Sequence, residues 1–173
     1  MFVLPEFWGL AECRRIREAR DRGRSSPAEI FADGFHVDEE SRRAFDVEVD
    51  AAVVTEVQRA IDAVRPPVGR FFDLPLGGDE GPGFLRYPRG GFYRVHRDVA
   101  PGCDDEFPRR ISVVVFLTSA GEECEGGSLR LYEAGAVDVL PRAGTLVAFS
   151  SETPHEVLRV TAGVRDAIVD WFY

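Results

Sequence analysis

Residues Tyr87 to Asp98 read YPRGGFYRVHRD: aromatic and β-branched residues around a Gly-Gly turn, ending in His96-x-Asp98. This composition predicts two short strands joined by a turn. Residues i and i+2 of a strand project from the same face, so the His96 imidazole and the Asp98 carboxylate can reach one metal ion. His-x-Asp also arises by chance. The alternative to a metal site is therefore an ordinary strand histidine followed by an aspartate in a turn, unless further ligand candidates are found.

Runs of the same kind continue from about residue 82 to the C-terminus. Valine, isoleucine, phenylalanine and tyrosine alternate there with glycine, proline and acidic turns, which is typical of strands. The gaps between runs are too short for the helices that a parallel α/β sheet needs. We therefore expect a mainly β fold with an α brace, a double-stranded β-helix (jelly-roll) core packed by N-terminal helices. The expected strands are 82–88, 91–96, 110–118, 127–132, 144–150, 155–160 and 165–172.

The first part of the chain has helical periodicity. Residues 9–22 place Leu10, Cys13, Ile16 and Ala19 at helical spacing. Asp50 is a candidate N-cap for a second helix, which Pro66-Pro67 interrupts. We expect a single domain over 1–173, with 1–81 as a helical N-terminal brace and 82–173 as the catalytic core.

Composition excludes several classes of protein. The net charge of −9 argues against a nucleic-acid partner, because phosphate binding needs a basic face. The cations are all arginine, so any bound anion is held by arginine, histidine or backbone donors. No apolar run approaches the roughly 20 residues that span a bilayer. The start lacks a basic n-region, so we expect a cytoplasmic protein without a membrane partner. The three cysteines lack a CxxC pattern, which disfavours a disulfide framework or a zinc site.

Two downstream residues join the His96-x-Asp98 pair. His155 begins a later predicted strand, and Arg165 follows it ten residues on. Two histidines and one carboxylate form the facial triad of non-heme iron(II) enzymes. The alternative for His155 is a histidine at a strand edge, and for Arg165 a surface arginine.

Residues 82–173 resemble the catalytic core of the iron(II)/2-oxoglutarate-dependent oxygenases, in the branch that contains the prolyl 4-hydroxylases. The resemblance rests on an ordered set of motifs. These are Tyr87-Pro88 with Tyr93-x-x-His96-x-Asp98, the strand Arg110–Leu117, Gly126-Gly127-Ser128-Leu129, Pro141-x-x-Gly144-Thr145-Leu146-x-x-Phe149, His155-Glu156-Val157 and Arg165-x-Ala167-Ile168-x-x-Trp171. The N-terminal FWGLAECRRI is similar to the leading helix of the family.

The resemblance implies a cofactor set and a reaction. His96, Asp98 and His155 would be the catalytic iron(II) ligands, leaving positions open for 2-oxoglutarate and O2. Ascorbate is a further candidate cofactor. Oxidative decarboxylation to succinate and CO2 would be coupled to hydroxylation of an unactivated C–H bond. Related halogenases lack the carboxylate ligand, so Asp98 favours hydroxylation.

The resemblance also assigns cosubstrate contacts. Arg165 would clamp the distal carboxylate of 2-oxoglutarate, since its planar fork pairs bidentately with carboxylates. Tyr87 aligns with a family tyrosine that bonds near the cosubstrate, although a buried core tyrosine explains it equally well. The nucleic-acid demethylase branch carries a second arginine after the clamp, and none follows Arg165.

Two positions depart from the family pattern. Phe116 stands where many prolyl hydroxylases have a tyrosine, and Val169 where some have a threonine. Both residues lack the hydroxyl that reaches the distal carboxylate in those relatives. We therefore expect the carboxylate to depend more heavily on Arg165, with Ser112, Thr145 or water as helpers.

The substrate remains open at this level. One hypothesis is hydroxylation of a prolyl or other peptidyl or amino-acid side chain, and another is hydroxylation of a small biosynthetic molecule. A third is a non-catalytic jelly-roll binding domain, which the complete residue set disfavours. Acidic clusters at 104–106 and 122–125 would select a cationic substrate if they lined the mouth of the core, but solvated acidic loops are the commoner explanation. The oligomeric state is not encoded in any motif.

Overall fold

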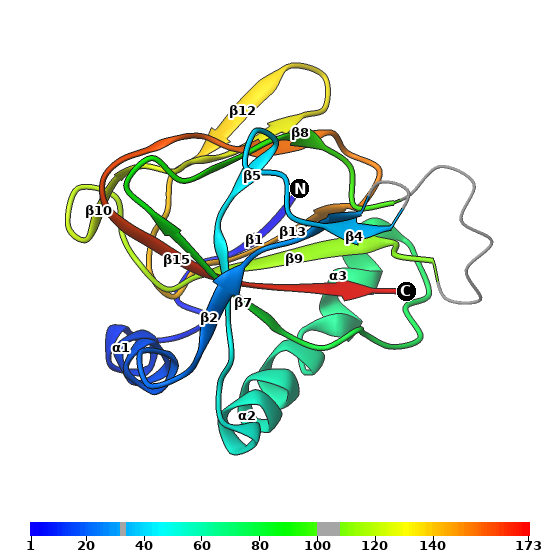
Figure 1. Ribbon diagram of the computed structural model, residues 1–173. Coiled ribbons are helices and arrows are strands. Elements are labelled where there is room, and N and C mark those ends of the chain that lie inside the picture. Colours follow the sequence, from blue (N-terminus) through cyan, green and yellow to red (C-terminus); the bar gives the residue numbers. More distant parts are fainter. Residues whose placement is uncertain (32–33, 100–107) are drawn as a thin grey trace.

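Two antiparallel sheets face each other and enclose an interior, as the ribbon of Figure 1 shows. The structure, a computed structural model, describes residues 1–31, 34–99 and 108–173. In that part, the larger sheet has eight strands and the smaller has five, and a two-stranded hairpin stands apart. This arrangement confirms the expected mainly β jelly roll with a helical brace.

The larger sheet is built mostly from the second half of the chain. Its order is β1 (Phe2–Leu4), β13 (Leu146–Ser150), β9 (Ile111–Phe116), β15 (Val160–Phe172), β7 (Gly83–Pro88), β6 (Phe45–Val47) and β2 (Ser25–Pro27), with β10 (Cys124–Gly126) paired to β15. The smaller sheet runs β12 (Ala136–Val139), β11 (Leu129–Tyr132), β14 (His155–Val157), β8 (Phe92–His96) and β5 (Arg42–Arg43). The separate hairpin is β3 (Ile30–Phe31) with β4 (Phe35–His36).

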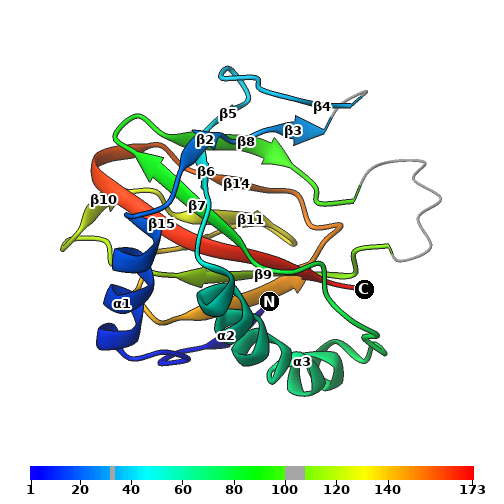
Figure 2. The ribbon, with the colours of Figure 1, turned by 60° about the horizontal axis from the view of Figure 1, so that its bottom comes forward.

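Three helices cover the outer face of the larger sheet, below it in Figure 2. They are α1 (Leu10–Arg20), α2 (Ala51–Asp62) and α3 (Arg65–Phe72). Their buried residues pack against outward side chains of β9 and β15, among them Val113, Val115 and Ile168. Asp50 is the N-cap residue of α2, as expected, without a side-chain capping bond. The two prolines stand in the first turn of α3, where a missing N–H costs nothing.

Strand alternation on β15 creates the inner core. Ala167 and Val169 point into the interior, whereas Ile168 packs toward the helices. The interior cluster gathers apolar side chains from both sheets: Val114, Phe116, Leu129, Leu131, Val147, Phe149 and Ala167. Arg165 lies two residues before Ala167 and therefore shares this inward face.

The structure adds strands that the sequence analysis did not predict. The first 81 residues, expected to form a helical brace, also supply β1 to β6, and β1, β2 and β6 extend the larger sheet. β10 and β12 were also missed. Strands of two to four residues have no alternation of their own, because pairing with a neighbouring strand defines them.

Cys13 is a core residue of α1, and Cys124 is a buried residue of β10. Both thiols are free, and Cys103 lies outside the described residues. No helix of the described part is long and apolar enough to cross a membrane.

One buried carboxylate of β15 predicts a pH effect on stability. Asp170 accepts hydrogen bonds from Gly81 N (3.1 Å), Gln58 Nε2 (3.3 Å) and its neighbour Trp171 N (2.7 Å). Burial, reinforced by the charge of Asp79, nevertheless raises the pKa of Asp170 to about 6. A carboxyl with a raised folded-state pKa stabilises the fold when protonated, and this stability is lost as the pH rises toward 6.

The variant Asp170→Asn is expected to remove this dependence. On lowering the pH from about 8 to about 5, the wild type should gain about 1.5 kcal/mol of unfolding free energy relative to the variant. Urea unfolding of both proteins across that range measures the difference. A constant difference between the two proteins would show that Asp170 titrates normally.

Candidate functional site

Two imidazoles and one carboxylate converge where β8 and β14 pair. His96 ends β8 and is directly opposite His155, the first residue of β14. His96 Nε2 lies 3.5 Å from Asp98 Oδ1, and His155 Nε2 lies 3.5 Å from Asp98 Oδ2. The candidate ligand atoms of all three residues lie within 4.8 Å of one another. The structure thus brings together the three residues that the sequence singled out, while the third histidine, His36, is exposed on β4.

The other nitrogen of each ring is held by a backbone carbonyl. His96 Nδ1 lies 2.8 Å from Arg94 O, and His155 Nδ1 lies 2.9 Å from Thr153 O. A carbonyl can only accept, so each Nδ1 carries the proton and each Nε2 presents its lone pair toward Asp98. Metal-binding histidines have this arrangement, with one nitrogen oriented by an outer hydrogen bond. The donor set therefore fits a divalent ion such as iron(II).

Charge and burial favour the ligand form of each group. Burial lowers the pKa of His155, which keeps its imidazole neutral. Burial opposes ionisation of Asp98, but the neighbouring His96 and His155 and the hydrogen bond from the Ser112 hydroxyl together hold its pKa below the usual value. A neutral imidazole beside an ionised carboxylate is the state that binds a metal ion.

Aromatic rings fix the two imidazoles from the sides. The Tyr93 ring stacks on His96 with centroids 3.5 Å apart, and the Phe149 ring meets His155 edge-on at 4.7 Å. Burial raises the pKa of Tyr93 to about 12, so its phenol stays protonated. Tyr93 is thus a packing residue beside the cluster.

Arg165 is a buried cation in the same interior. Its side chain is 1% exposed, and its guanidinium carbon lies 4.9 Å from the Tyr87 ring centroid and 5.3 Å from that of Phe116. Burial lowers its pKa, but an arginine stays protonated in a protein. Among residues 1–31, 34–99 and 108–173, no carboxylate forms an ion pair with it, and Nε is buried without a hydrogen-bond partner.

A buried cation without a partner is costly, so Arg165 is suited to receive an anion. Its sequence neighbour Asp166 points to the opposite face of β15 and is bound by Arg20 and Arg86. Phe116 and Phe149 belong to one apolar cluster, which links the Arg165 end of the interior to His155. Arg165 and His155 therefore border the same apolar cluster.

The backbone near Arg165 is shaped around its side chain. Gly127 has φ +69°, and a Cβ there would come within 2.9 Å of Arg165 Cδ. The Gly-Gly turn found in the sequence thus makes room for the arginine. Tyr87 is 1% exposed and pairs with Arg165 in the β7–β15 register, so its ring forms one wall of the arginine site.

Other residues considered from the sequence have different places. Ser112, expected as a cosubstrate helper, instead donates from Oγ to Asp98 Oδ2 at 2.6 Å. Glu123 pairs with Arg17 of α1 at 2.6 Å, which gives part of the second acidic cluster a structural role. Arg159, six residues before Arg165, is exposed. The acidic cluster at 104–106 lies outside the described residues.

Two residues near the metal cluster were not predicted from the sequence, Ser151 and Arg109. Ser151 Oγ lies 2.9 Å from Ser112 Oγ, and no sequence motif marks it. Arg109 stacks 3.7 Å over the Trp171 ring and pairs with Glu80 at 2.6 Å. Trp171 and Glu80 also line a groove of about 580 Å³ that extends to α2 and contains none of the three cluster residues.

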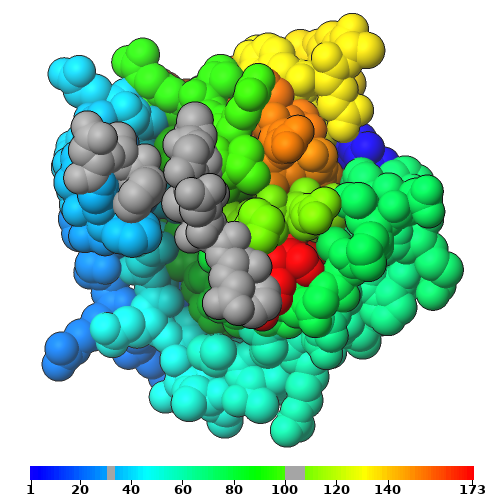
Figure 3. Space-filling view, turned by 90° about the vertical axis from the view of Figure 1, so that its right-hand side faces the viewer, coloured from blue at the N-terminus to red at the C-terminus, as the bar shows by residue number. Residues whose placement is uncertain are grey.

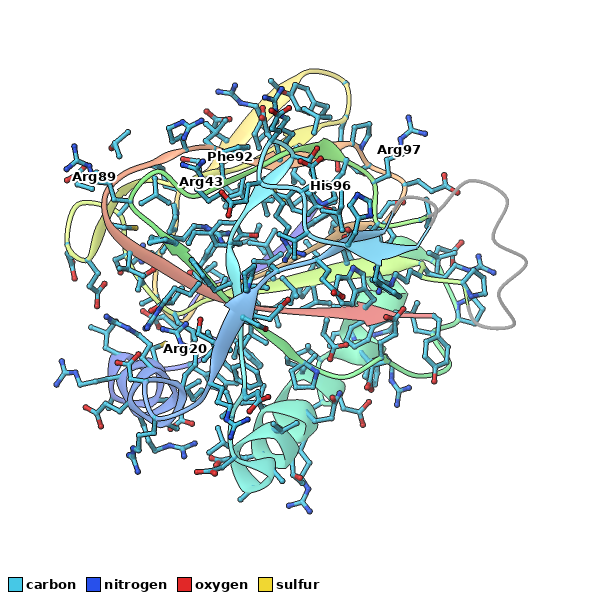
Figure 4. All side chains as sticks on the ribbon, viewed as in Figure 1. Arg20, Arg43, Arg89, Phe92, His96 and Arg97 are labelled. Atoms are coloured by element: carbon cyan, nitrogen blue, oxygen red, sulfur yellow. The ribbon has the colours of Figure 1, made fainter. Side chains whose placement is uncertain are left out.

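Figure 3 shows the face of the molecule on which the green segment around β8 lies beside the orange segment around β14. These two strands carry His96 and His155. Figure 4 labels His96 at the end of β8 and shows its neighbour Arg97 pointing outward. His96 is thus half-buried within the cluster, whereas Arg97 is exposed to solvent.

The family model of the 2OG-Fe(II) oxygenase superfamily matches residues 82–173, which contain the cluster and Arg165. The chain belongs to the 2OG-Fe(II) oxygenase superfamily. Curated relatives include a PKHD-type hydroxylase of Stenotrophomonas maltophilia (strain R551-3), 38% identical over 94 residues, and one of Parvibaculum lavamentivorans, 41% identical over 91 residues. These matches cover 52% and 50% of this chain but 41% and 38% of the relatives, so the chain spans about two fifths of their length.

Solved structures of similar fold cover nearly the whole chain. A prolyl-4-hydroxylase of Pseudomonas putida aligns over 99% of this chain and 90% of its own, with 27% identity and a TM-score of 0.75. A prolyl hydroxylase of Trichoplax adhaerens, in complex with a hypoxia inducible factor peptide fragment, aligns over 99% and 82% with a TM-score of 0.81. At 22% identity, the second likeness supports the oxygenase jelly-roll fold alone.

Proposed function

We propose that this protein is an iron(II)- and 2-oxoglutarate-dependent dioxygenase that hydroxylates an unactivated C–H bond of a prolyl or other peptidyl side chain. One observation carries the proposal. Two Nε2 atoms and a carboxylate converge in an interior that also holds a buried arginine, with which no carboxylate of the described residues forms an ion pair. The first group suits iron(II), and the second suits a dicarboxylate cosubstrate.

The ligand roles follow from the geometry. His96 Nε2, His155 Nε2 and one oxygen of Asp98 would occupy one face of the ion and leave the other face open. When bound, iron(II) with 2-oxoglutarate and O2 supplies the oxidising power for C–H hydroxylation, with release of succinate and CO2. The protein holds the ligands in place through the carbonyls of Arg94 and Thr153.

Arg165 has the largest part in cosubstrate binding. Phe116 and Val169 carry no hydroxyl, so neither side chain can donate to the distal carboxylate. The guanidinium can form two parallel hydrogen bonds with that carboxylate. The rings of Tyr87 and Phe116 beside it exclude water and strengthen this pairing.

Support for a peptidyl substrate comes from the comparisons. The Pseudomonas putida relative is described as a prolyl-4-hydroxylase, and it shares 27% of its aligned residues with this chain. Its alignment covers both the helices and the sheets of this chain. A prolyl or similar side chain is therefore the first substrate class to examine.

A mass-spectrometric assay tests the proposal. Proline-containing peptides and free amino acids are incubated with the protein, iron(II), 2-oxoglutarate and O2. We expect a peptide to gain the mass of one oxygen atom while succinate forms, and Asp98→Ala to show neither. A gain on free amino acids alone would point to a small-molecule hydroxylase. Absence of succinate release would favour a non-catalytic binding domain, and iron-independent release would contradict the assigned metal role.

A further inference from the structure

Two buried serines behind Asp98 have no role in the reaction as proposed. Ser112 of β9 is 2% exposed, and Ser151, which follows β13, is 0% exposed. Ser112 Oγ lies 2.6 Å from Asp98 Oδ2 and 2.9 Å from Ser151 Oγ. The three side chains thus form a row that ends on the carboxylate of the metal cluster.

The direction of each hydrogen bond in this row is fixed by chemistry. An ionised carboxylate only accepts, so the single proton of Ser112 points to Asp98. Ser112 Oγ must then accept from Ser151, whose proton is directed along the row. Bonds to an ionised acceptor are the stronger ones, and a chain of hydroxyls polarises each member further.

The backbone ties the same residues into one unit. Asp98 N donates to Ser151 O at 3.0 Å, and Ser151 N donates to Arg110 O at 3.0 Å. Ser151 therefore holds the main chain of Asp98 directly and the side chain of Asp98 through Ser112. The rotation of the carboxylate is set by these contacts before any metal arrives.

A structural role alone does not account for the two hydroxyls. The other inward residues of β9, Val114 and Phe116, are apolar and pack in the interior cluster. A buried hydroxyl costs free energy unless it is hydrogen-bonded, and an alanine or valine would fill the position without that cost. The only acceptor that Ser112 serves in the described part of the chain is Asp98 Oδ2.

The two carboxylate oxygens of Asp98 are therefore not equivalent. Each oxygen faces one imidazole Nε2 at 3.5 Å, Oδ1 that of His96 and Oδ2 that of His155. Only Oδ2 also receives the Ser112 hydrogen bond, at 2.6 Å. We infer that Ser112, supported by Ser151, is a positioning residue that keeps Asp98 a one-oxygen metal ligand through Oδ1. This inference rests on the proposed function, because it assumes that the cluster binds a metal ion. Its effect is to keep one coordination position from being closed by the second oxygen.

The test measures metal binding without turnover. Wild type, Ser112→Ala and Ser112→Thr are titrated with Mn²⁺ in a calorimeter, and their Co²⁺ absorption spectra are recorded, since band intensity reports coordination number. We expect Ser112→Ala to weaken Mn²⁺ binding by about 10- to 100-fold, as is typical for loss of an outer-shell partner. Its Co²⁺ spectrum should change toward a higher coordination number, and Ser112→Thr should restore both readouts.

Thr118→Val is the matched control, because Thr118 is also fully buried but its Oγ1 accepts from Asp166 N, away from Asp98. This variant should bind Mn²⁺ as the wild type does. Equal binding and equal spectra in Ser112→Ala and wild type would overturn the inference and leave the proposed function intact. An equal loss of Mn²⁺ affinity in Ser112→Ala and Thr118→Val would also overturn the inference, because it would show that the loss comes from disturbed packing. A wild type that binds no metal would refute the proposed function itself.

Discussion

Arg165→Ala is expected to abolish turnover of 2-oxoglutarate. The guanidinium is 1% exposed and forms no ion pair within the described residues, so it is available to the distal carboxylate. Each charge-assisted hydrogen bond contributes about 1.5–3 kcal/mol, and a bidentate pair supplies two. Losing both should weaken 2-oxoglutarate binding by about 10²- to 10⁴-fold.

The assay loads the protein with iron(II) and 2-oxoglutarate without O2, then adds O2 and measures the succinate released. Weaker 2-oxoglutarate binding lowers the amount of succinate. Arg159→Ala is the matched control, since Arg159 is an exposed arginine that contacts Gly90 O and the Phe92 ring. Arg165→Ala should still bind Mn²⁺, because the three metal ligands are untouched. Near-normal succinate release by Arg165→Ala would remove Arg165 from the cosubstrate site.

The second large effect concerns stability. Asp166 of β15 is fully buried and pairs with the fully buried Arg20 of α1 and with Arg86 Nε at 3.1 Å. Figure 4 labels Arg20 at the helix that this pair fastens to the sheet. Removing one partner of a buried pair leaves an unpaired buried charge, which costs about 3–5 kcal/mol. Asp166→Ala should therefore lower the melting temperature by roughly 6–20 °C for a chain of this size.

Thermal unfolding followed by circular dichroism measures the change. Asp138→Ala provides the comparison, because Asp138 pairs with Arg130 at 2.6 Å in an exposed position where ion pairs contribute little. We expect only a small shift in that variant. If Asp166→Ala melted as close to the wild type as Asp138→Ala does, the pair would not fasten α1 to the sheet.

The metal-ligand candidates could be predicted because their sequence pattern is local. Strand alternation places His96 and Asp98 on one face, and the matching motifs around His155 and Arg165 extend the site to later strands. Four of the five described strands of five or more residues were found for the same reason, whereas β15 begins at Val160, which the expected strand 155–160 had included, and not at residue 165. The family resemblance gave Arg165 its expected role, and the structure shows that this arginine is buried rather than on the surface.

The remaining features depend on contacts between distant segments. Strand alternation can place Ser112 on the inner face of its strand, but it does not predict the hydrogen bond from Ser112 to Asp98. That bond depends on the backbone hydrogen bond from Asp98 N to Ser151 O, which no sequence motif encodes. The Arg20–Asp166 ion pair joins α1 to the last strand. Because the chain contains many arginines, the sequence does not indicate which of them pairs with Asp166. β5 consists of Arg42 and Arg43 and exists only because β8 lies beside it.

An anaerobic crystal structure with Mn²⁺ and 2-oxoglutarate tests the central claim most directly. We predict one metal ion bound by His96 Nε2, His155 Nε2 and Asp98 Oδ1, with the distal carboxylate of 2-oxoglutarate paired to Arg165. A metal ion held by other residues, or 2-oxoglutarate bound away from Arg165, would contradict the account.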